Sequence, residues 1–215
     1  MSIYIGTGKV KRVYSTTTPV KKIYIGNNLV FKASRLPNAY QEVEWIGTSG
    51  TQYIKTGVSW SGSSSFKWEI KAQSTSNNTQ VLFSSSNNAS GGTWLGIYQN
   101  KWWFDSAFTE TYSDLIEAEV NYNGSSLTCT INGNTHTKSS PAITGTNACL
   151  FCADNLSSYA SVKLYKCILY KNGTKIRELV PCYRTSDNEI GLYDLVNNVF
   201  YTNEGTGVFT KGGNV

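Results

Sequence analysis

Hydrophobic and polar residues alternate with a period of two along much of this chain. The clearest run extends from Phe66 to Lys71, where apolar residues take every second position and charged residues fill the positions between. Neighbouring side chains of a β-strand point to opposite faces of the sheet. The alternation therefore predicts a strand with one buried and one solvated face.

Short runs of this kind follow one another through most of the chain. The predicted strands are 42–46, 51–56, 66–72, 79–85, 93–98, 101–105, 116–122, 126–132, 148–153, 160–170, 175–180, 191–195, 198–202 and 207–210. Asn-Gly pairs separate several of them, and Asn-Gly between apolar runs is the strongest local hairpin signal. So many short strands predict an all-β, two-sheet antiparallel sandwich.

An internal repeat occupies the first part of the chain. The sequence Ile3-Tyr4-Ile5-Gly6 recurs as Ile23-Tyr24-Ile25-Gly26. A second apolar run follows each copy, at 10–14 and at 29–31, so each unit predicts a short β-hairpin. An isolated hairpin is marginal in water, so we expect this segment to pair with another chain, with a copy of itself or with the main domain. A basic, partly ordered leader is the alternative.

Charge is distributed unevenly along the chain. Residues 1–35 hold seven basic residues and no acid, so the net charge of +5 leaves −2 for residues 36–215. The basic residues are Lys9, Lys11, Arg12, Lys21, Lys22, Lys32 and Arg35, and the first five are the predicted attachment residues. A basic block is also typical of nucleic-acid binding. Because these charges alternate with β-branched and aromatic residues, we favour attachment to a partner protein.

The cysteines indicate reduced thiols. Their number is five, and Met1 to Tyr4 do not open a secretory signal, so we expect synthesis in a cytosol. Cys149-x-x-Cys152 has the spacing of half a zinc or redox site, but there is no second pair, and His136 is distant. We expect the cysteines to be small apolar strand residues. No apolar run approaches the roughly 20 residues of a membrane span.

Two longer stretches carry a resemblance to a known family. The first is Leu36 to Gly57, which contains Tyr-Gln-Glu-Val-Glu-Trp-Ile, and the second is Pro181 to Asn203, which contains Gly-Leu-Tyr-Asp-Leu. Together they resemble the opening and closing strands of concanavalin A-like, laminin-G-like jelly rolls, which are common in phage and prophage structural proteins of gut bacteria. The resemblance implies a jelly-roll sandwich over 36–215, with residues 52–56 close to residues 200–202. Residues 1–35 are similar to short repeats that precede such domains in phage tail proteins.

This resemblance implies a virion protein, such as a tail fibre, baseplate or head-fibre component, that is assembled in the bacterial host cytoplasm and binds a host-surface glycan. Residues 1–35 would attach it to other virion proteins, and we expect a homo-oligomer because weak sites need avidity. We expect no nucleic-acid partner and no membrane insertion. Two alternatives stay open, since this fold hosts many functions. They are a purely structural capsid-decoration or assembly protein, and an unrecognised glycan hydrolase.

Glycoside hydrolases of the same superfold carry paired carboxylates in a Glu-x-Asp-x-Glu pattern, which flank the glycosidic bond. This chain has no such triplet. Glu42 and Glu44 share a strand face, as do Glu117 and Glu119, but no further acid completes either pattern. We expect no enzyme and no catalytic residue, and we interpret His136 as an exposed loop residue.

The densest aromatic cluster lies between residues 94 and 104, where Tyr98 to Trp102 reads as a hairpin. Alternation places Trp102 and Phe104 on one face and Trp103 on the other, so we expect at least one large ring to be exposed. The predicted glycan-binding residues are Trp94, Tyr98, Gln99, Asn100, Trp102, Trp103 and Asp105. The alternative is that all these rings belong to the core.

Calcium is the one cofactor for which the sequence offers donors. Laminin-G-like domains can hold this ion, and Asp154 and Asp187 supply candidate loop oxygens. Neither lies in a defined calcium-loop spacing, so we expect turn stabilisation at Asp187 instead.

Overall fold

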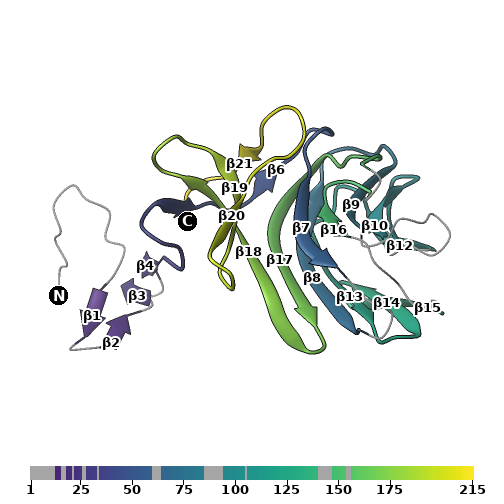
Figure 1. The fold of residues 1–215 in the computed structure, drawn as a ribbon, viewed down its shortest axis with the longest axis horizontal. Helices are drawn as coiled ribbons and strands as arrows, with labels where there is room; N and C mark the ends of the chain where they lie inside the picture. Colours follow the sequence, from purple (N-terminus) through teal and green to yellow (C-terminus); the bar gives the residue numbers. More distant parts are fainter. Residues whose placement is uncertain are drawn as a thin grey trace.

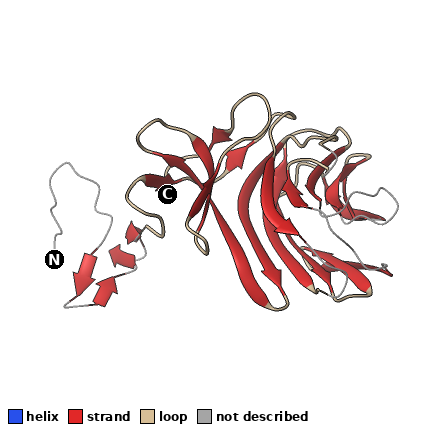
Figure 2. Ribbon diagram, viewed as in Figure 1, coloured by secondary structure: helices blue, strands red, loops and turns tan. Residues whose placement is uncertain are grey.

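The computed structural model of the chain is an all-β protein, as the alternation predicts. It describes residues 13–15, 18–20, 22–25, 28–32, 34–59, 64–84, 94–104, 106–139, 147–153 and 156–215. These residues form strands and turns without a helix (Figure 2). Within them, accordingly, no helix is long and apolar enough to cross a membrane.

The smaller of two antiparallel sheets has six strands. In spatial order they are β12 (Ser106–Thr111), β11 (Lys101–Phe104), β10 (Trp94–Tyr98), β9 (Gln80–Ser84), β16 (Asn147–Leu150) and β7 (Ile54–Ser59). The edge strand β7 is covered by side chains from the C-terminal part of the chain, which occupy its free backbone groups. Tyr201 donates to the Thr56 carbonyl at 3.3 Å, and the Lys55 amide donates to Glu204 at 2.8 Å. The predicted proximity of residues 52–56 and 200–202 is confirmed.

The larger sheet has eleven strands in the described part of the chain. Its main path is β15 (Asn134–Ser139), β14 (Ser126–Ile131), β13 (Ile116–Tyr122), β8 (Phe66–Ser74), β17 (Val162–Lys171), β18 (Thr174–Arg184), β19 (Ile190–Asp194) and β20 (Val199–Tyr201). Three short strands lie off this path, namely β5 (Tyr40–Glu42), β6 (Ile46–Gly47) and β21 (Thr210–Lys211). The two sheets pack as a sandwich (Figure 1).

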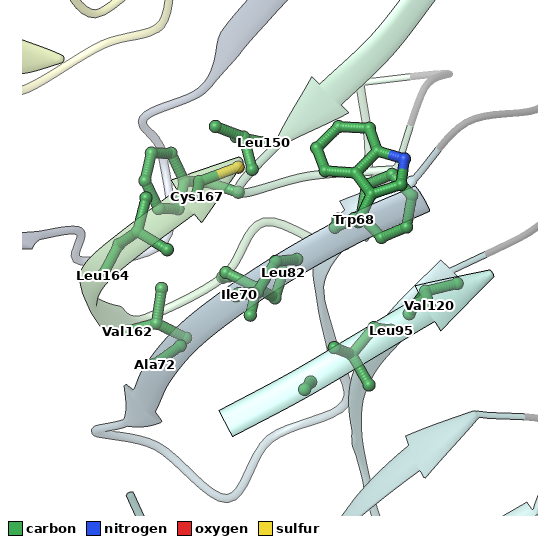
Figure 3. Packing of buried hydrophobic residues seen from close by; sticks show 14 of the residues in the cluster. Trp68, Ile70, Ala72, Leu82, Leu95, Val120, Leu150, Val162, Leu164 and Cys167 are labelled. Carbon is green, nitrogen blue, oxygen red and sulfur yellow. The ribbon is translucent and has the colours of Figure 1, made fainter. Parts of the chain in front are cut away.

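The core lies between the inner faces of the sheets. Along β8 the buried and half-buried residues alternate without interruption, as predicted from the sequence. Trp68 on β8 is fully buried, and its ring centroid is 3.7 Å from that of Phe83 on β9 of the other sheet. Figure 3 shows Trp68 in the same cluster as Ile70 and Leu95. This contact joins the sheets through two of the largest fully buried side chains of the described residues.

Two strands of the sandwich were not predicted from the sequence. They are the edge strands β12 and β15, whose residues are mostly polar. The prediction that His136 lies in an exposed loop is wrong. It lies on β15 opposite Cys129, and its ring stacks on Phe108 with centroids 4.2 Å apart. An apolar pattern is weak where only one residue of an edge strand reaches the core.

The N-terminal segment contains two hairpins among its described residues. β1 (Val13–Ser15) pairs with β2 (Thr18–Val20), and β3 (Lys22–Ile25) pairs with β4 (Asn28–Lys32). The second predicted hairpin is therefore confirmed. The first predicted hairpin lies largely outside the described residues. In the described part, neither two-stranded sheet pairs with a strand of the sandwich.

The chain enters the sandwich at Arg35 and Leu36. Leu36 is buried in a small apolar cluster with Val180 and Tyr193. Arg35 forms ion pairs with Glu42 at 2.8 Å and Glu178 at 3.1 Å. These contacts hold the root of the N-terminal segment on the outer surface of β18 and β19.

Candidate functional site

The hairpin of β10 and β11 carries the predicted aromatic site. Its two-residue turn is Gln99-Asn100, with φ values of 50° and 65°, and Tyr98 pairs directly with Lys101. Two successive residues with positive φ are the geometry of a type I′ turn, whose twist matches that of the flanking strands. The predicted hairpin is confirmed, and it projects both turn side chains into solvent.

Alternation along β10 and β11 divides the side chains of the hairpin between two faces. Leu95, Ile97 and Phe104 point into the core. Trp94, Tyr98 and Trp103 lie on the outer face, and we call these three residues the aromatic shelf. Trp94 and Trp103 are half-buried, and Tyr98 is 38% exposed.

The rings of Tyr98 and Trp103 form a pair within the shelf. Their centroids are 5.0 Å apart, and their planes meet at 64°, which is the edge-to-face arrangement that aromatic quadrupoles favour. Each ring therefore restrains the other while part of both remains accessible to solvent. This gives a preorganised aromatic surface on a two-stranded support.

Trp102 is not part of this surface. It is fully buried, and its Nε1–H donates to the Asp114 carbonyl at 3.3 Å. Its prediction as a glycan-binding residue is wrong for a physical reason. Consecutive strand residues face opposite sides, so Trp102 and Trp103 cannot both be at the surface.

Polar groups surround the shelf. Gln99 and Asn100 are exposed at the tip, and the Asn100 carbonyl accepts the Tyr112 amide at 3.0 Å, which ties the turn to the neighbouring chain. Lys101 donates to the Thr109 carbonyl at 2.8 Å. Asp105, also predicted here, lies outside the described residues.

A loop borders the shelf on the side of β9. We call residues 151–153 and 156–160 the strap. The strap is attached to β9, since Val81 donates to the Ser158 carbonyl at 2.8 Å and Ser84 donates to the Cys152 carbonyl at 3.2 Å. Ser84 is the cross-strand partner of Trp94, so the strap lies next to the shelf.

The backbone of the strap is unusual. Phe151, Leu156 and Ser158 have φ values of 70°, 56° and 51°, a conformation that costs non-glycine residues energy. Such residues concentrate at ligand sites and switch regions, where the surrounding structure holds the strain. Its position beside the aromatic rings makes the strap a candidate wall of the same site.

The candidate calcium and thiol sites find no support in the geometry. Asp187 forms an ion pair with Arg184 at 2.6 Å and accepts a hydrogen bond from the Glu189 amide at 3.2 Å. It therefore stabilises the turn before β19, as expected. Asp154 lies outside the described residues. The five cysteines are buried, and burial raises the pKa of the Cys182 thiol to about 12. Within the described residues, no three His, Cys, Asp or Glu side chains gather as metal ligands.

The outward carboxylates of the larger sheet form ion pairs. Glu119 on β13 lies directly opposite Glu69 on β8, and Lys67 reaches the two at 3.4 Å and 2.9 Å. Burial raises the pKa of Glu69, but hydrogen bonds from Lys166 and Lys67 outweigh it and hold the value at about 2. A glycosidase needs one carboxyl group that stays protonated, and Glu69 is held ionised instead. This arrangement is typical of a solvated strand face.

Most of the predicted attachment residues cannot be placed. Lys9, Lys11, Arg12 and Lys21 lie outside the described residues. Lys22 opens β3, and its register partner on β4 is Lys32.

The aromatic pair of Tyr53 and Tyr159 was not predicted from the sequence. The two ring centroids are 6.2 Å apart, and both rings are half-buried. Tyr159 follows a stretch rich in Ser and Asn, which is a weak signal for an aromatic residue displayed by a loop. Because Tyr53 and Tyr159 are far apart in the sequence, no local pattern indicates that their rings lie close together.

Comparison with known proteins does not assign the chain to a family. No protein-family model matches the sequence, and no curated protein matches it closely.

Proposed function

We propose that this protein is a phage virion appendage component whose sandwich, a jelly roll, binds a host-surface glycan without catalysis. The observation that carries the proposal is the aromatic shelf. Tyr98 and Trp103 form a preorganised, partly exposed pair on the outer face of a sheet.

Sugar recognition fits the chemistry of the shelf. The ring face of a hexose presents C–H groups that pack on an aromatic face, and its rim presents hydroxyl groups. Ligand sites commonly combine aromatic surface with a few placed polar groups. Here the exposed amides of Gln99 and Asn100 and the backbone of the strap provide the polar groups beside the rings.

The ends of the sandwich suit an appendage. In Figure 1 the C-terminus and β19–β20 lie toward the N-terminal segment, whereas β10 and β12 lie on the far side. Arg35 and Leu36 fix the root of that segment on the near side. Attachment to other virion proteins through residues 1–35 would therefore direct the shelf outward, and several copies on one particle would add avidity.

Binding to a glycan array and to host cells tests this function. We expect Trp103→Ala to weaken binding about fivefold, since one aromatic contact of this kind contributes about 1 kcal/mol. Tyr165→Ala removes a half-buried ring from β17 of the other sheet and serves as the matched control. Unchanged binding by a folded Trp103→Ala protein would exclude the shelf as the site. Release of new reducing ends from a bound glycan would favour the hydrolase alternative.

A further inference from the structure

A second aromatic pair lies on the same sheet as the shelf. Tyr53 directly precedes Ile54, whose side chain is in the core, so alternation directs Tyr53 and Lys55 to the outer face. Tyr159 of the strap packs beside Tyr53, and the Lys55 ammonium lies 5.7 Å from the Tyr53 ring centre. The strap thus contributes one ring to a second, partly exposed aromatic contact.

One row of backbone neighbours connects the two aromatic pairs. Tyr159 forms a bridge with Val81, Val81 pairs with Gly96, and Gly96 pairs with Trp103. The row crosses three strand-to-strand spacings, which is about 14 Å. It runs perpendicular to the strands, and its two ends carry the rings of Tyr159 and Trp103.

The middle of the row is apolar and buried. Val81 is 6% exposed, and Gly96 lacks a side chain because a Cβ there would collide with the Gln80 carbonyl of the adjacent strand. No charged side chain of this row stands between the two aromatic ends. A chain-like ligand that reaches from one pair to the other therefore meets no charged side chain of this row.

We infer that the shelf and the Tyr53–Tyr159 pair together bind one extended, linear glycan chain that lies across the strands, and not a single terminal sugar. This inference rests on the proposed function. The distance between the pairs exceeds one sugar ring, so only a chain of several sugars reaches both. Two weak contacts on one ligand then add, because the second forms at high effective concentration.

The strap explains how the second contact is held. The Ala160 amide donates to the Phe151 carbonyl at 2.7 Å, which closes the loop at its base. The Val81 amide fixes Ser158, the residue before Tyr159. Strain at Ser158 is therefore retained by β9, and it places Tyr159 in line with the shelf.

A length series tests the inference on the full chain. The probes are cello-, chito-, xylo- and malto-oligosaccharides from monosaccharide to octasaccharide, printed beside capsular polysaccharide and lipopolysaccharide of gut bacteria and their partial hydrolysates. In the bound series we expect affinity to increase about tenfold or more between the disaccharide and the hexasaccharide. Equal affinity for the monosaccharide and the longest member overturns the inference.

Substitutions in the two aromatic pairs distinguish this inference from the proposed function on which it rests. Tyr159→Ala should weaken binding of long members and leave the disaccharide unchanged, whereas Trp103→Ala should weaken both. Tyr159→Phe keeps the ring and should bind like the original protein. If Trp103→Ala weakens binding while Tyr159→Ala leaves the longest member unaffected, the extended-chain inference fails and the proposed function stands. If no glycan on the array binds, both the extended-chain inference and the proposed function fail.

Discussion

Single residues show how the closing part of the chain is stabilised. Asp194 is fully buried at the end of β19. It accepts the Glu178 and Val196 amides at 3.1 Å and 2.9 Å, and it lies 3.5 Å from Arg177. One carboxylate therefore joins β18 to the turn between β19 and β20. The Tyr-Asp-Leu sequence that carried the family resemblance has this structural role.

Removal of the Asp194 carboxylate should be costly. We expect Asp194→Ala to lower the free energy of unfolding by about 3 kcal/mol, because the Glu178 and Val196 amides and the Arg177 guanidinium lose their buried partner. Urea denaturation measures the change. Asp187→Ala, which removes an exposed ion pair with Arg184, should cost much less. Equal costs for the two variants would contradict the role assigned to Asp194.

The turn residue Gln99 offers a second test at this scale. A non-glycine residue at φ 50° is strained by about 1 kcal/mol, so Gln99→Gly should raise the melting temperature. The same change deletes an amide that we place beside the glycan, so affinity should fall while stability rises. Asn100→Gly is the control, because Asn tolerates this conformation better. A lower melting temperature of the Gln99→Gly protein would show that the backbone conformation of Gln99 does not strain the turn.

At the scale of elements, the strands of the larger sheet are joined across their outer face by Lys67, Glu69 and Lys166. The pKa of Glu69 is held at about 2, below its ordinary value of 4.5. A carboxylate with a lowered pKa stabilises the fold above its ordinary pKa, and this contribution disappears as pH falls toward the lowered value.

We therefore expect the original protein to lose stability between about pH 4.5 and pH 2, with about 1 kcal/mol of the loss due to Glu69 after solvent screening. Glu69→Gln should show a flatter profile in this interval. Urea denaturation at stepped pH measures both, with Glu189→Gln on the exposed turn as the control. If the stabilities of Glu69→Gln and the original protein fell in parallel as the pH was lowered, Glu69 would not contribute to this ion-pair network.

Elements also show what the sequence could and could not predict. The alternation of hydrophobic and polar residues was sufficient to predict β8 and β13, where every second residue is buried. It also predicted the exposure of Trp103. It failed for β12 and β15, because edge strands bury few residues. The contact between Tyr53 and Tyr159 depends on a bridge between the strap and β9, and such long-range pairing leaves no local pattern.

At the scale of the whole molecule, the N-terminal segment and the sandwich are expected to be separable. Among the described residues, the hairpins β1–β2 and β3–β4 pair only internally. Deletion of residues 1–33, which keeps Arg35 and Leu36, should leave the melting temperature and glycan affinity nearly unchanged and abolish incorporation into particles. Differential scanning calorimetry and a particle-incorporation assay measure these effects. A large loss of thermal stability would mean that the segment belongs to the sandwich core.

The central claim is that the outer rings of the β10–β11 hairpin contact a glycan. The most direct measurement follows the indole N–H resonances of the six tryptophans while a glycan selected on the array is added. Trp103 and Trp94 should shift with glycan concentration, whereas the fully buried Trp68 and Trp102 should not. Saturable binding that leaves Trp103 and Trp94 unshifted, or that shifts Trp45 alone, would contradict the account.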